Sequence, residues 1–367
     1  MTKYMKINRM LALCLSPDQG GLELYFLKLV NYYHSINQDL SVACVKKSYI
    51  KKNVSKNIVE CLSKGLFNNI YNFFLIRNYI MKKRINIIHV SWAKDIFLAI
   101  MLKLLSPGKI KVIFYRQMKI SRSKKDIYHK FIYKQIDLLL VITEKLYSEA
   151  CEHLPMDSSK IYKLTYGIKT PPIKSLVDKE KFFSKNNIKS NIFTIGVFSR
   201  IEEQKGQHLV LNAINKSRHK IQLCIVGHSM DDKYKDRLIR DAKDAGLDKN
   251  LKFINFVNSP MSYMPCFDLI ILPTYEETFG LIVAEAMFMK VPVIGSNAGG
   301  VPEIISHGSN GLLFETKNDD DLQKKIDMII ENENERDKLV NNGYTFANDH
   351  YNHKGHFDKL ETIIRTL

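Results

Sequence analysis

The sequence predicts an α/β protein built from two doubly wound parallel-sheet domains in tandem. Its 367 residues suffice for two domains of about 150 residues each. Short apolar runs alternate with longer amphipathic segments along the chain, as strands alternate with helices around parallel sheets. Residues 171–190 interrupt this alternation with Pro171-Pro172 and many Lys and Ser residues, so we expect a linker there. The expected organisation is a first domain at 1–170, the linker at 171–190, a second domain at 191–350 and a C-terminal helix at 351–367 that packs back on the first domain.

In the first domain, the apolar runs predict strands and the amphipathic segments predict helices. The expected strands are Met10–Leu15, Leu40–Val45, Ile85–Val90, Lys111–Tyr115 and Leu138–Thr143. The expected helices are Leu22–Ser35, Phe73–Lys83, Ile96–Leu105 and Asp126–Ile136. The run Met10–Leu15 follows basic residues, as in a signal peptide. Because it is short and no small-residue cleavage site follows, a first strand explains it better.

The second domain repeats the architecture without repeating the sequence. The expected strands are Phe193–Phe198, Ile221–Val226, Leu251–Phe256, Asp268–Pro273 and Val291–Gly295. The expected helices are Gln207–Asn215, Lys233–Ala245, Leu281–Met289, Asp319–Asn334 and Lys354–Thr366. Ligands of such sheets bind beyond the carboxyl ends of the strands, and two facing domains would place a ligand in the cleft between them.

The excess of positive charge lies entirely in the first half of the chain. Residues 1–175 contain 30 Lys and Arg against 11 Asp and Glu, which is +19, whereas the remainder carries −2. A genome-wide preference for Lys codons would act on both halves, so the asymmetry favours a polyanionic partner: nucleic acid, an anionic membrane surface or an acidic substrate. The basic clusters that could rest on a membrane are Lys46-Lys47, Lys51-Lys52, Lys82-Lys83-Arg84 and the stretch from Lys119 to Lys125.

Cysteine usage and hydropathy indicate a compartment. The six cysteines are scattered and form neither a zinc pattern nor a disulfide framework, as expected in a reducing cytoplasm. No segment approaches the ~18–20 apolar residues of a membrane-spanning helix. We therefore expect a cytoplasmic protein that meets the inner face of the membrane only from its surface.

The segment 273–285, PTYEETFGLIVAE, holds the most informative candidate site. Glu277 lies in a loop after a strand, and Glu285 lies eight residues further on, between one and two turns inside the next helix. Backbone N–H groups of Thr278, Phe279, Gly280 and Leu281 at the start of that helix could bind a phosphate. Glu285 could accept hydrogen bonds from a diol such as ribose. Taken alone, both carboxylates could equally serve to stabilise the first turns of the helix electrostatically.

Three further loops follow expected strands. In GVFSRIEEQKG, residues 196–206, Arg200 and Lys205 suit a diphosphate, although they could also be two exposed bases. Paired glycines at Gly299-Gly300 and Gly20-Gly21 allow a ligand to approach the backbone closely. A GxGxxG dinucleotide motif and a Walker A motif are both missing, so dinucleotide and P-loop chemistry are unsupported.

Together these pieces resemble the retaining glycosyltransferases of family 4, which have the GT-B fold of two Rossmann-like domains. The resemblance rests on an ordered set of motifs: GGLE at 20–23, SRIEEQKG at 199–206, EETFGLIVAEAM at 276–287, GGVPEII at 299–305 and NGLLF at 310–314. It covers essentially the whole chain and is strongest over residues 192–316. The pair of glutamates alone is a weak signal, but its combination with the flanking motifs is specific.

The resemblance implies a nucleotide-diphospho-sugar donor bound by the second domain. Arg200 and Lys205 would hold the pyrophosphate and offset the charge that builds on the leaving group, and Thr278 to Leu281 would add backbone donors. Glu285 would bind the ribose, and Glu277 would bind the donor sugar. Gly20 and Gly21 would let the first domain close on the phosphates. No DxD metal motif lies in a fitting place, so no metal or other cofactor is expected.

One position departs from the family pattern. Many relatives have a histidine in the acceptor-side cleft, after a strand near the middle of the first domain, where this chain has Arg116-Gln117. Either residue could take over sugar contacts, which leaves the donor sugar open. His89, at the end of another expected strand, is a further cleft candidate, although a lone histidine there is more often a packing or capping residue. Tyr166 replaces the Asn of the family's N-G-[IV] turn.

The leading hypothesis is therefore a retaining glycosyltransferase that acts on a glycan acceptor. If the protein lies at a membrane, we expect this acceptor to be lipid-linked, such as a lipopolysaccharide or another envelope glycan precursor. The alternative enzyme is a GT-B-like nucleotide-sugar epimerase, which needs no acceptor. A non-catalytic alternative is a polyanion-binding protein. Binding to nucleic acid is not expected, because the bases are dispersed and no recognised binding module occurs. A catalytically dead glycan-binding subunit fits poorly with complete donor motifs.

Overall fold

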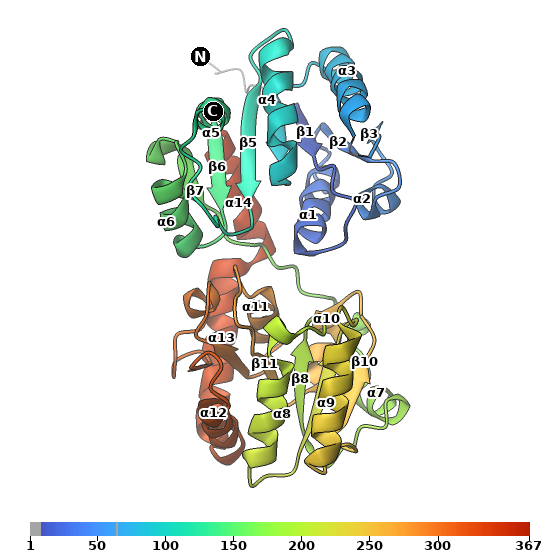
Figure 1. Cartoon of the computed structure of the whole chain (residues 1–367), viewed down its shortest axis with the longest axis vertical. Coiled ribbons are helices and arrows are strands. Elements are labelled where there is room, and N and C mark those ends of the chain that lie inside the picture. The colour runs from blue at the N-terminus through green and yellow to red at the C-terminus, as the bar shows by residue number, and fades with distance from the viewer. Residues whose placement is uncertain (1–8, 64) are drawn as a thin grey trace. The chain divides into compact units, whose positions relative to one another are not determined.

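The structure, a computed structural model, describes residues 9–63 and 65–367 and divides into two units. The first unit runs to Leu164 and regains Lys359–Leu367, and the second spans Thr165–Asp358. Each unit holds one parallel sheet, so the expected fold class is confirmed (Figure 1). Residues 1–8 of the expected first domain lie outside the described residues.

The sheet of the first unit has the strand order β3-β2-β1-β4-β5-β6-β7. Its strands are β1 (Met10–Leu13), β2 (Leu40–Val45), β3 (Ile58–Cys61), β4 (Ile87–Val90), β5 (Lys111–Arg116), β6 (Leu138–Val141) and β7 (Ile161–Lys163). Its helices are α1 (Gly21–Ser35), α2 (Tyr49–Asn53), α3 (Leu66–Lys83), α4 (Ile96–Leu105), α5 (Ile127–Lys134) and α6 (Glu144–His153). The central strands are buried along their whole length because helices cover both faces of the sheet.

The sheet of the second unit has the strand order β10-β9-β8-β11-β12-β13. Its strands are β8 (Phe193–Phe198), β9 (Ile221–Val226), β10 (Leu251–Ile254), β11 (Leu269–Leu272), β12 (Val293–Ser296) and β13 (Leu312–Phe314). Its helices are α7 (Lys179–Lys185), α8 (Gln207–Lys216), α9 (Asp232–Asp244), α10 (Pro260–Tyr263), α11 (Leu281–Phe288), α12 (Asp319–Glu331) and α13 (Glu333–Tyr351); α14 (His353–Ile364) follows.

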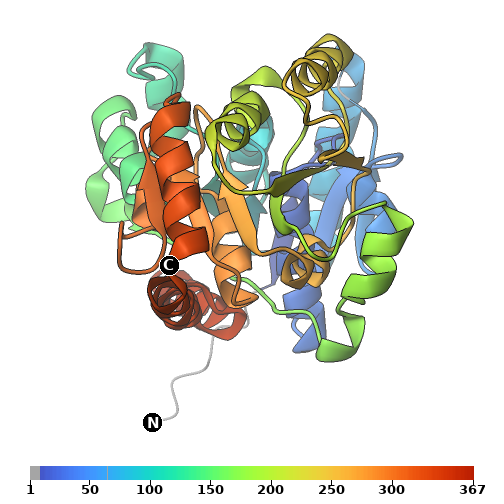
Figure 2. The same cartoon turned by 90° about the horizontal axis from the view of Figure 1, so that it is seen from below.

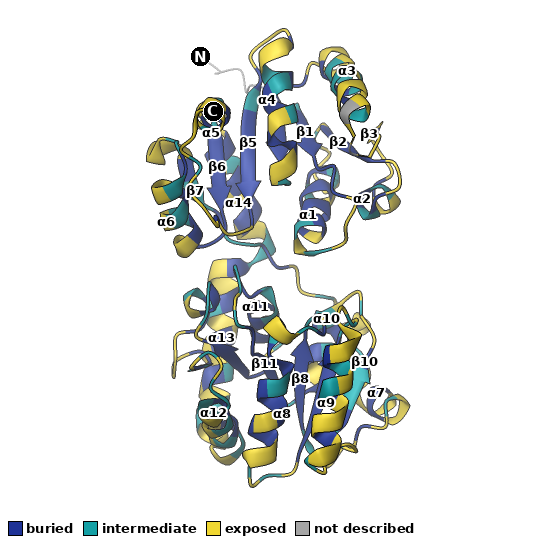
Figure 3. Cartoon of the chain, viewed as in Figure 1, coloured by how far each residue is buried: buried dark blue, intermediate teal, exposed yellow. Residues whose placement is uncertain are grey.

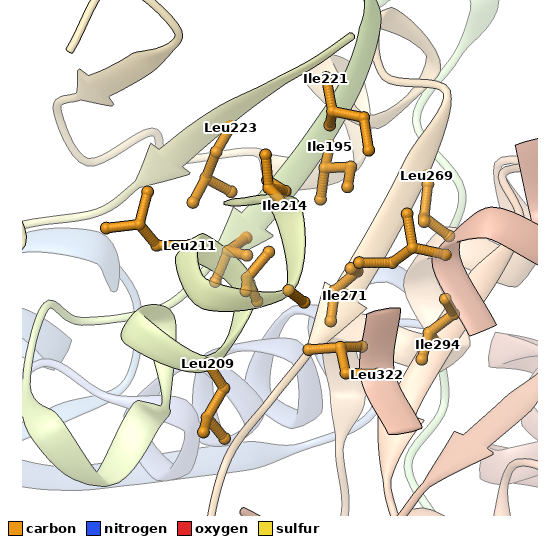
Figure 4. Packing of buried hydrophobic residues seen from close by; sticks show 14 of the residues in the cluster. Ile195, Leu209, Leu211, Ile214, Ile221, Leu223, Leu269, Ile271, Ile294 and Leu322 are labelled. Carbon is orange, nitrogen blue, oxygen red and sulfur yellow. The ribbon is translucent and has the colours of Figure 1, made fainter. Parts of the chain in front are cut away.

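Helices flank this second sheet on both sides (Figure 2). Helix α12 packs against α8, and α13 packs against α11. The core between α8, α12 and the sheet is a cluster of apolar side chains that includes Ile195, Leu211 and Leu322 (Figure 4). Because this core fixes β8 and β11 side by side, it also fixes where their carboxyl ends lie.

The unit boundary differs from the expected linker. Residues 171–190 contain α7 and belong to the second unit by their contacts. Asp178 caps α7 by accepting a hydrogen bond from the N–H of Lys181. Phe182 is buried against Tyr263 and Phe267, with ring centroids 5.4 and 5.9 Å away. The proline pair marks a turn before this helix, and the unit itself begins at Thr165.

None of the described helices is both long enough and apolar enough to span a lipid bilayer.

Candidate active site

The candidate site of the second unit lies at the point where the strand order reverses, between β8 and β11. In a doubly wound sheet, the loops after these two strands diverge and leave room for a ligand. The loop after β8 carries Arg200 and Lys205, and the loop after β11 carries Glu277. A backbone hydrogen bond of 2.9 Å from the N–H of Tyr275 to the carbonyl of Gln204 joins the two loops. The sheet topology therefore brings the two strongest sequence motifs together.

Lys205 and Glu277 form an ion pair across these loops. Lys205 Nζ lies 3.3 Å from Glu277 Oε2, and the two side chains are 20% and 25% exposed. The sequence assigned both residues to the donor but did not predict that they pair. Because a lysine ammonium has three hydrogens to donate, Lys205 can hold Glu277 and still donate to a phosphate oxygen.

Two glycines with left-handed backbone conformation allow the loops of the site to approach each other closely. Gly206 has φ +69°, and a Cβ there would lie 2.1 Å from the carbonyl oxygen of Pro273. Gly299 has φ +61°, and a Cβ there would lie 1.7 Å from the carbonyl oxygen of Glu277. The same Glu277 carbonyl accepts a 2.9 Å hydrogen bond from the N–H of Gly300. The glycines thus allow the loops after β8 and β12 to lie against the segment from Pro273 to Glu277.

Arg200 lies on the open side of the site. Its side chain is 52% exposed, and Nη2 lies 3.0 Å from Glu202 Oε1. Gln207 is fully buried beneath it and donates to the Arg200 carbonyl at 2.8 Å and to Ser199 Oγ at 2.9 Å. The backbone at Arg200 is therefore held in place, while its guanidinium can turn toward an anion.

Helix α11 begins beside Glu277. Gly280 precedes it with φ +97°, and Glu285 lies in its second turn with only 7% of its surface exposed. The N–H of Thr278 donates to Glu277 Oε1 at 3.1 Å. The first N–H groups of a helix lack partners within the helix, so this end favours negative charge. The backbone N–H groups of residues 278–281 thus lie at the start of α11, in the segment between Glu277 and Glu285.

Aromatic side chains support the start of α11. Phe279 is buried, and its ring lies 5.0 Å from that of Tyr166 and 5.4 Å from that of Tyr351. Burial, followed by the nearby Glu277 carboxylate, raises the pKa of Tyr166 above its ordinary value. Tyr166, which replaces the Asn of the family turn, thus lies against the start of α11, which the sequence did not predict.

A histidine that sequence reasoning missed ties the Glu277 loop to the helices behind it. His208 Nε2 lies 2.7 Å from the Tyr275 hydroxyl, and Nδ1 lies 2.9 Å from the Tyr234 hydroxyl. Burial, and then the Arg237 guanidinium, lower the pKa of His208, which favours the neutral ring with one donor and one acceptor. Lys317 Nζ covers the Tyr275 ring at 4.8 Å. His208 thereby stabilises the loop at Tyr275, two residues before Glu277.

The other predicted site residues lie in the first unit. Gly20 precedes α1 in an extended conformation, and Gly21 is its first residue. His89 is completely buried in β4; among the described residues neither ring nitrogen has a hydrogen-bond partner, and burial lowers its pKa to about 4. Arg116 and Gln117, at the end of β5, are also buried, and Arg116 donates to the carbonyl of Lys119 at 2.8 Å. Their roles toward a sugar stay predictions.

Among the described residues, one group has the composition of a metal site. His219, Asp327 and Glu331 offer ligand atoms within 4.8 Å of one another. His219 precedes β9, so the group lies at the amino ends of the strands, away from the switch-point loops. Arg218 already donates twice to Glu331 Oε1, at 3.0 and 2.5 Å, which makes this group an ion-pair cluster.

Comparisons with known proteins assign the class of activity. Residues 178–346, within the second unit, match the family model of glycosyl transferases group 1. The chain is a glycosyltransferase. The matched segment contains Arg200, Lys205, Glu277 and Glu285.

Relatives and solved structures agree with this assignment. The glycosyltransferase is 25% identical to the uncharacterized glycosyltransferase MJ1178 of Methanocaldococcus jannaschii over 90% of each chain. It is also 25% identical to the O-antigen biosynthesis glycosyltransferase WclY of Escherichia coli, over 78% of this chain and 80% of that one. HepE of Anabaena, solved in complex with UDP, has the same fold, with a TM-score of 0.84 and 16% identity over 98% of this chain and all of that one. The glycosyltransferase has the GT-B fold.

The His208 bond gives a first testable prediction for this glycosyltransferase. We expect Tyr275→Phe, which keeps the ring under Lys317 but removes the hydroxyl, to lower kcat for sugar transfer roughly fivefold, because one neutral hydrogen bond contributes about 1 kcal/mol. Steady-state kinetics would measure this, with Tyr344→Phe, an exposed tyrosine of the same unit, as control. A parent-like kcat for Tyr275→Phe would show that the bond does not position the loop.

Proposed function

We propose that this glycosyltransferase moves a sugar from a nucleotide-diphospho-sugar to a glycan acceptor with retention at the anomeric carbon. The observation that carries the proposal is the Lys205–Glu277 pair at the switch point between β8 and β11, beside the start of α11. There a diphosphate can meet an ammonium, a guanidinium and helix N–H groups, while carboxylates accept bonds from hydroxyls. HepE, which shares the fold, was solved with UDP, and this supports a nucleotide-linked donor.

Each donor-site residue has a proposed role. Lys205 and Arg200 bind the diphosphate and stabilise the charge that develops as the bond from the anomeric carbon to the phosphate oxygen breaks. Glu285, buried in α11, accepts hydrogen bonds from the ribose hydroxyls, and Glu277 accepts them from the donor sugar. Because two cationic side chains and a helix N-terminus would face the diphosphate, we propose that the reaction needs no metal ion.

The proposed mechanism accounts for retention. As the nucleoside diphosphate leaves, its phosphate oxygen takes the proton of the incoming acceptor hydroxyl on the face that the leaving group vacates. The new bond to the anomeric carbon then has the configuration of the old one. In this proposal Glu277 orients the donor sugar and does not act as a nucleophile.

The proposed acceptor is a lipid-linked glycan of the cell envelope, and the proposed location is the cytoplasmic face of the membrane. The positive charge of residues 1–175 supports a membrane partner. The similarity to the O-antigen glycosyltransferase WclY supports an envelope polysaccharide as acceptor.

The deciding experiment is a screen of donor cleavage over a panel of nucleotide sugars. Mass spectrometry would detect a released nucleoside diphosphate and free sugar, as slow hydrolysis without acceptor. We expect one donor to be cleaved well above the others, and Glu285→Gln to raise its KM. A product that is an isomeric nucleotide sugar would identify an epimerase instead, and no turnover of any donor together with no nucleotide binding would refute the proposal.

A further inference from the structure

The first unit has one helical layer whose exposed surface is unusually apolar. The described residues include 21 exposed large hydrophobic side chains, and 11 of these belong to α3, α4 and α5. Each of the other described helices has at most one exposed large hydrophobic side chain. These 11 are Phe67, Ile70, Tyr71, Phe74, Met81, Phe97, Leu104, Leu105, Ile127, Tyr128 and Phe131. Exposed apolar area concentrated in this way marks an interaction surface.

Helix α3 is apolar on two opposite faces. One face packs inward through Ile76 and Ile80, with Asn72 bonded to both backbone groups of Leu62. The outer stripe, Phe67, Ile70, Tyr71 and Phe74, has the spacing i, i+3, i+4, i+7 that lines up on one side of a helix. Packing within the unit accounts for the first face and leaves the second exposed.

The three helices form one continuous layer. The chain passes from β3 through α3, β4, α4, β5 and α5 to β6 while moving in one direction across the sheet. Because such crossovers are right-handed, these helices lie on the same face, and α1 and α2, whose strands progress the other way, lie on the opposite face. Arg77 Nε donates to the Leu105 carbonyl at 2.9 Å, and the Phe97 and Tyr128 rings stack at 6.2 Å. Figure 3 shows exposed residues along the outer sides of α3 and α4.

The net charge of this layer is positive. Helices α3, α4 and α5 contain six Lys and Arg residues and no Asp or Glu: Arg77, Lys82, Lys83, Lys103, Lys130 and Lys134. Basic side chains can extend past an apolar surface and place their charges at its border. Aromatic and aliphatic residues beside lysines of this kind suit the boundary between lipid headgroups and acyl chains.

We propose that the outer surface of α3, α4 and α5 docks on an anionic lipid bilayer and inserts its apolar side chains among the lipids. This proposal deepens the membrane location in the proposed function and rests on it. Asp137 pairs with Lys103, and Asp126 caps α5, but the other basic side chains leave the layer with a net positive charge. A second copy of the chain is a poor occupant, because a symmetric contact would bring this positive charge against itself. An anionic bilayer supplies both the apolar interior and the negative charge.

The proposal also predicts which of the basic clusters found in the sequence contact the bilayer. Lys82-Lys83-Arg84 ends α3, and the 119–125 stretch leads into α5, so both border the docking layer. Lys51-Lys52 lie in α2, in the opposite layer, and would not touch the same flat bilayer. Attraction by charge alone does not distinguish the clusters of the two layers, whereas docking through this layer uses only the clusters that border α3, α4 and α5.

The test measures co-flotation of the full chain with phosphatidylcholine vesicles that contain or lack phosphatidylglycerol. We expect binding to the anionic vesicles that weakens but persists as salt rises, because only the ionic part is screened. The double variant Phe67→Ser/Phe74→Ser should bind about tenfold more weakly at every salt concentration. Lys82→Gln/Lys83→Gln should bind about tenfold more weakly at low salt and match the parent at high salt.

A matched pair of isoleucines provides the control. Ile127 on α5 is 88% exposed, and Ile173 in the second unit is 87% exposed. Ile127→Ser should weaken vesicle binding, and Ile173→Ser should leave it unchanged. Since both side chains are on the surface, neither substitution should affect folding.

Several outcomes would overturn the proposal. Parent-like vesicle binding by Phe67→Ser/Phe74→Ser would show that the apolar surface makes no contact with lipid. Concentration-dependent dimers, seen by light scattering and lost in this variant, would assign the surface to a second copy. Vesicle-free donor hydrolysis should be unchanged in the variant, so the proposed sugar transfer and the docking surface can fail separately.

Discussion

Replacing Lys205 with alanine should lower the rate of donor cleavage by roughly 10²–10³-fold, the usual cost of removing one group that stabilises developing charge. Lys205 lies in the loop after β8 and meets Glu277 at 3.3 Å, so its ammonium is held at the switch point before a phosphate arrives. Glu277→Ala should cause a loss of similar size by removing the proposed contact to the donor sugar. Rapid-quench measurement of nucleoside diphosphate release would give both rates.

A matched lysine separates this effect from a general loss of charge. Lys216 ends α8 in the same unit and pairs with Asp319 and Asp320, so Lys216→Ala removes one cation and should keep full activity. Thermal unfolding should show that the Lys205 variant remains folded. Because Lys205 and Glu277 are in contact, the double variant should lose less than the two single losses combined. Full activity in both single variants would refute the site assignment.

The second large loss of activity should come from replacing Gly299, which has no side chain. In Gly299→Ala, the new methyl group would lie 1.7 Å from the Glu277 carbonyl oxygen, so the backbone that carries Glu277 must move. The left-handed φ of +61° adds a further cost for any residue with a Cβ. We expect sugar transfer to fall by at least about 10²-fold, since a displacement near 1 Å can have that effect. Steady-state kinetics with the preferred donor would measure the loss.

Gly308 is the natural control for this substitution. It also has a left-handed φ, +74°, but a Cβ there meets nothing within 4 Å. Gly308→Ala should therefore lower stability by roughly 1 kcal/mol through its backbone alone and leave activity intact. If the two variants lost activity equally, the cause would be backbone strain in general, and the contact with Glu277 would not explain the loss.

The regular part of the fold was predictable because buried parallel strands are continuous apolar runs. The expected and observed bounds agree at Phe193–Phe198, Ile221–Val226 and Ile96–Leu105. Sequence analysis missed β3 because this edge strand alternates, with Glu60 exposed between the buried Val59 and Cys61. It also missed α13, whose polar sequence includes Asn341-Asn342-Gly343 and lacks an apolar run.

The chemistry of the site was predictable from motifs, but its contacts were not. Local order along the chain placed Lys205 and Glu277 in loops after strands, whereas their pairing depends on β8 and β11 being neighbours. His208 was overlooked because a lone histidine at a helix start has no distinctive pattern, and its partners Tyr234 and Tyr275 come from distant segments. The exposed stripe of α3 was hidden as well, since a helix apolar on two faces looks in sequence like a buried one.

The neighbouring positions of β8 and β11 have a consequence for how the protein folds. Lys205 and Glu277 are 72 residues apart in sequence, so their contact forms only after a long loop has closed. The segment between them supplies β9 and β10 on the other side of β8. A chain that ended before β11 would therefore lack the site, so the ability to bind a donor can appear only after β11 and the loop that follows it have joined the sheet.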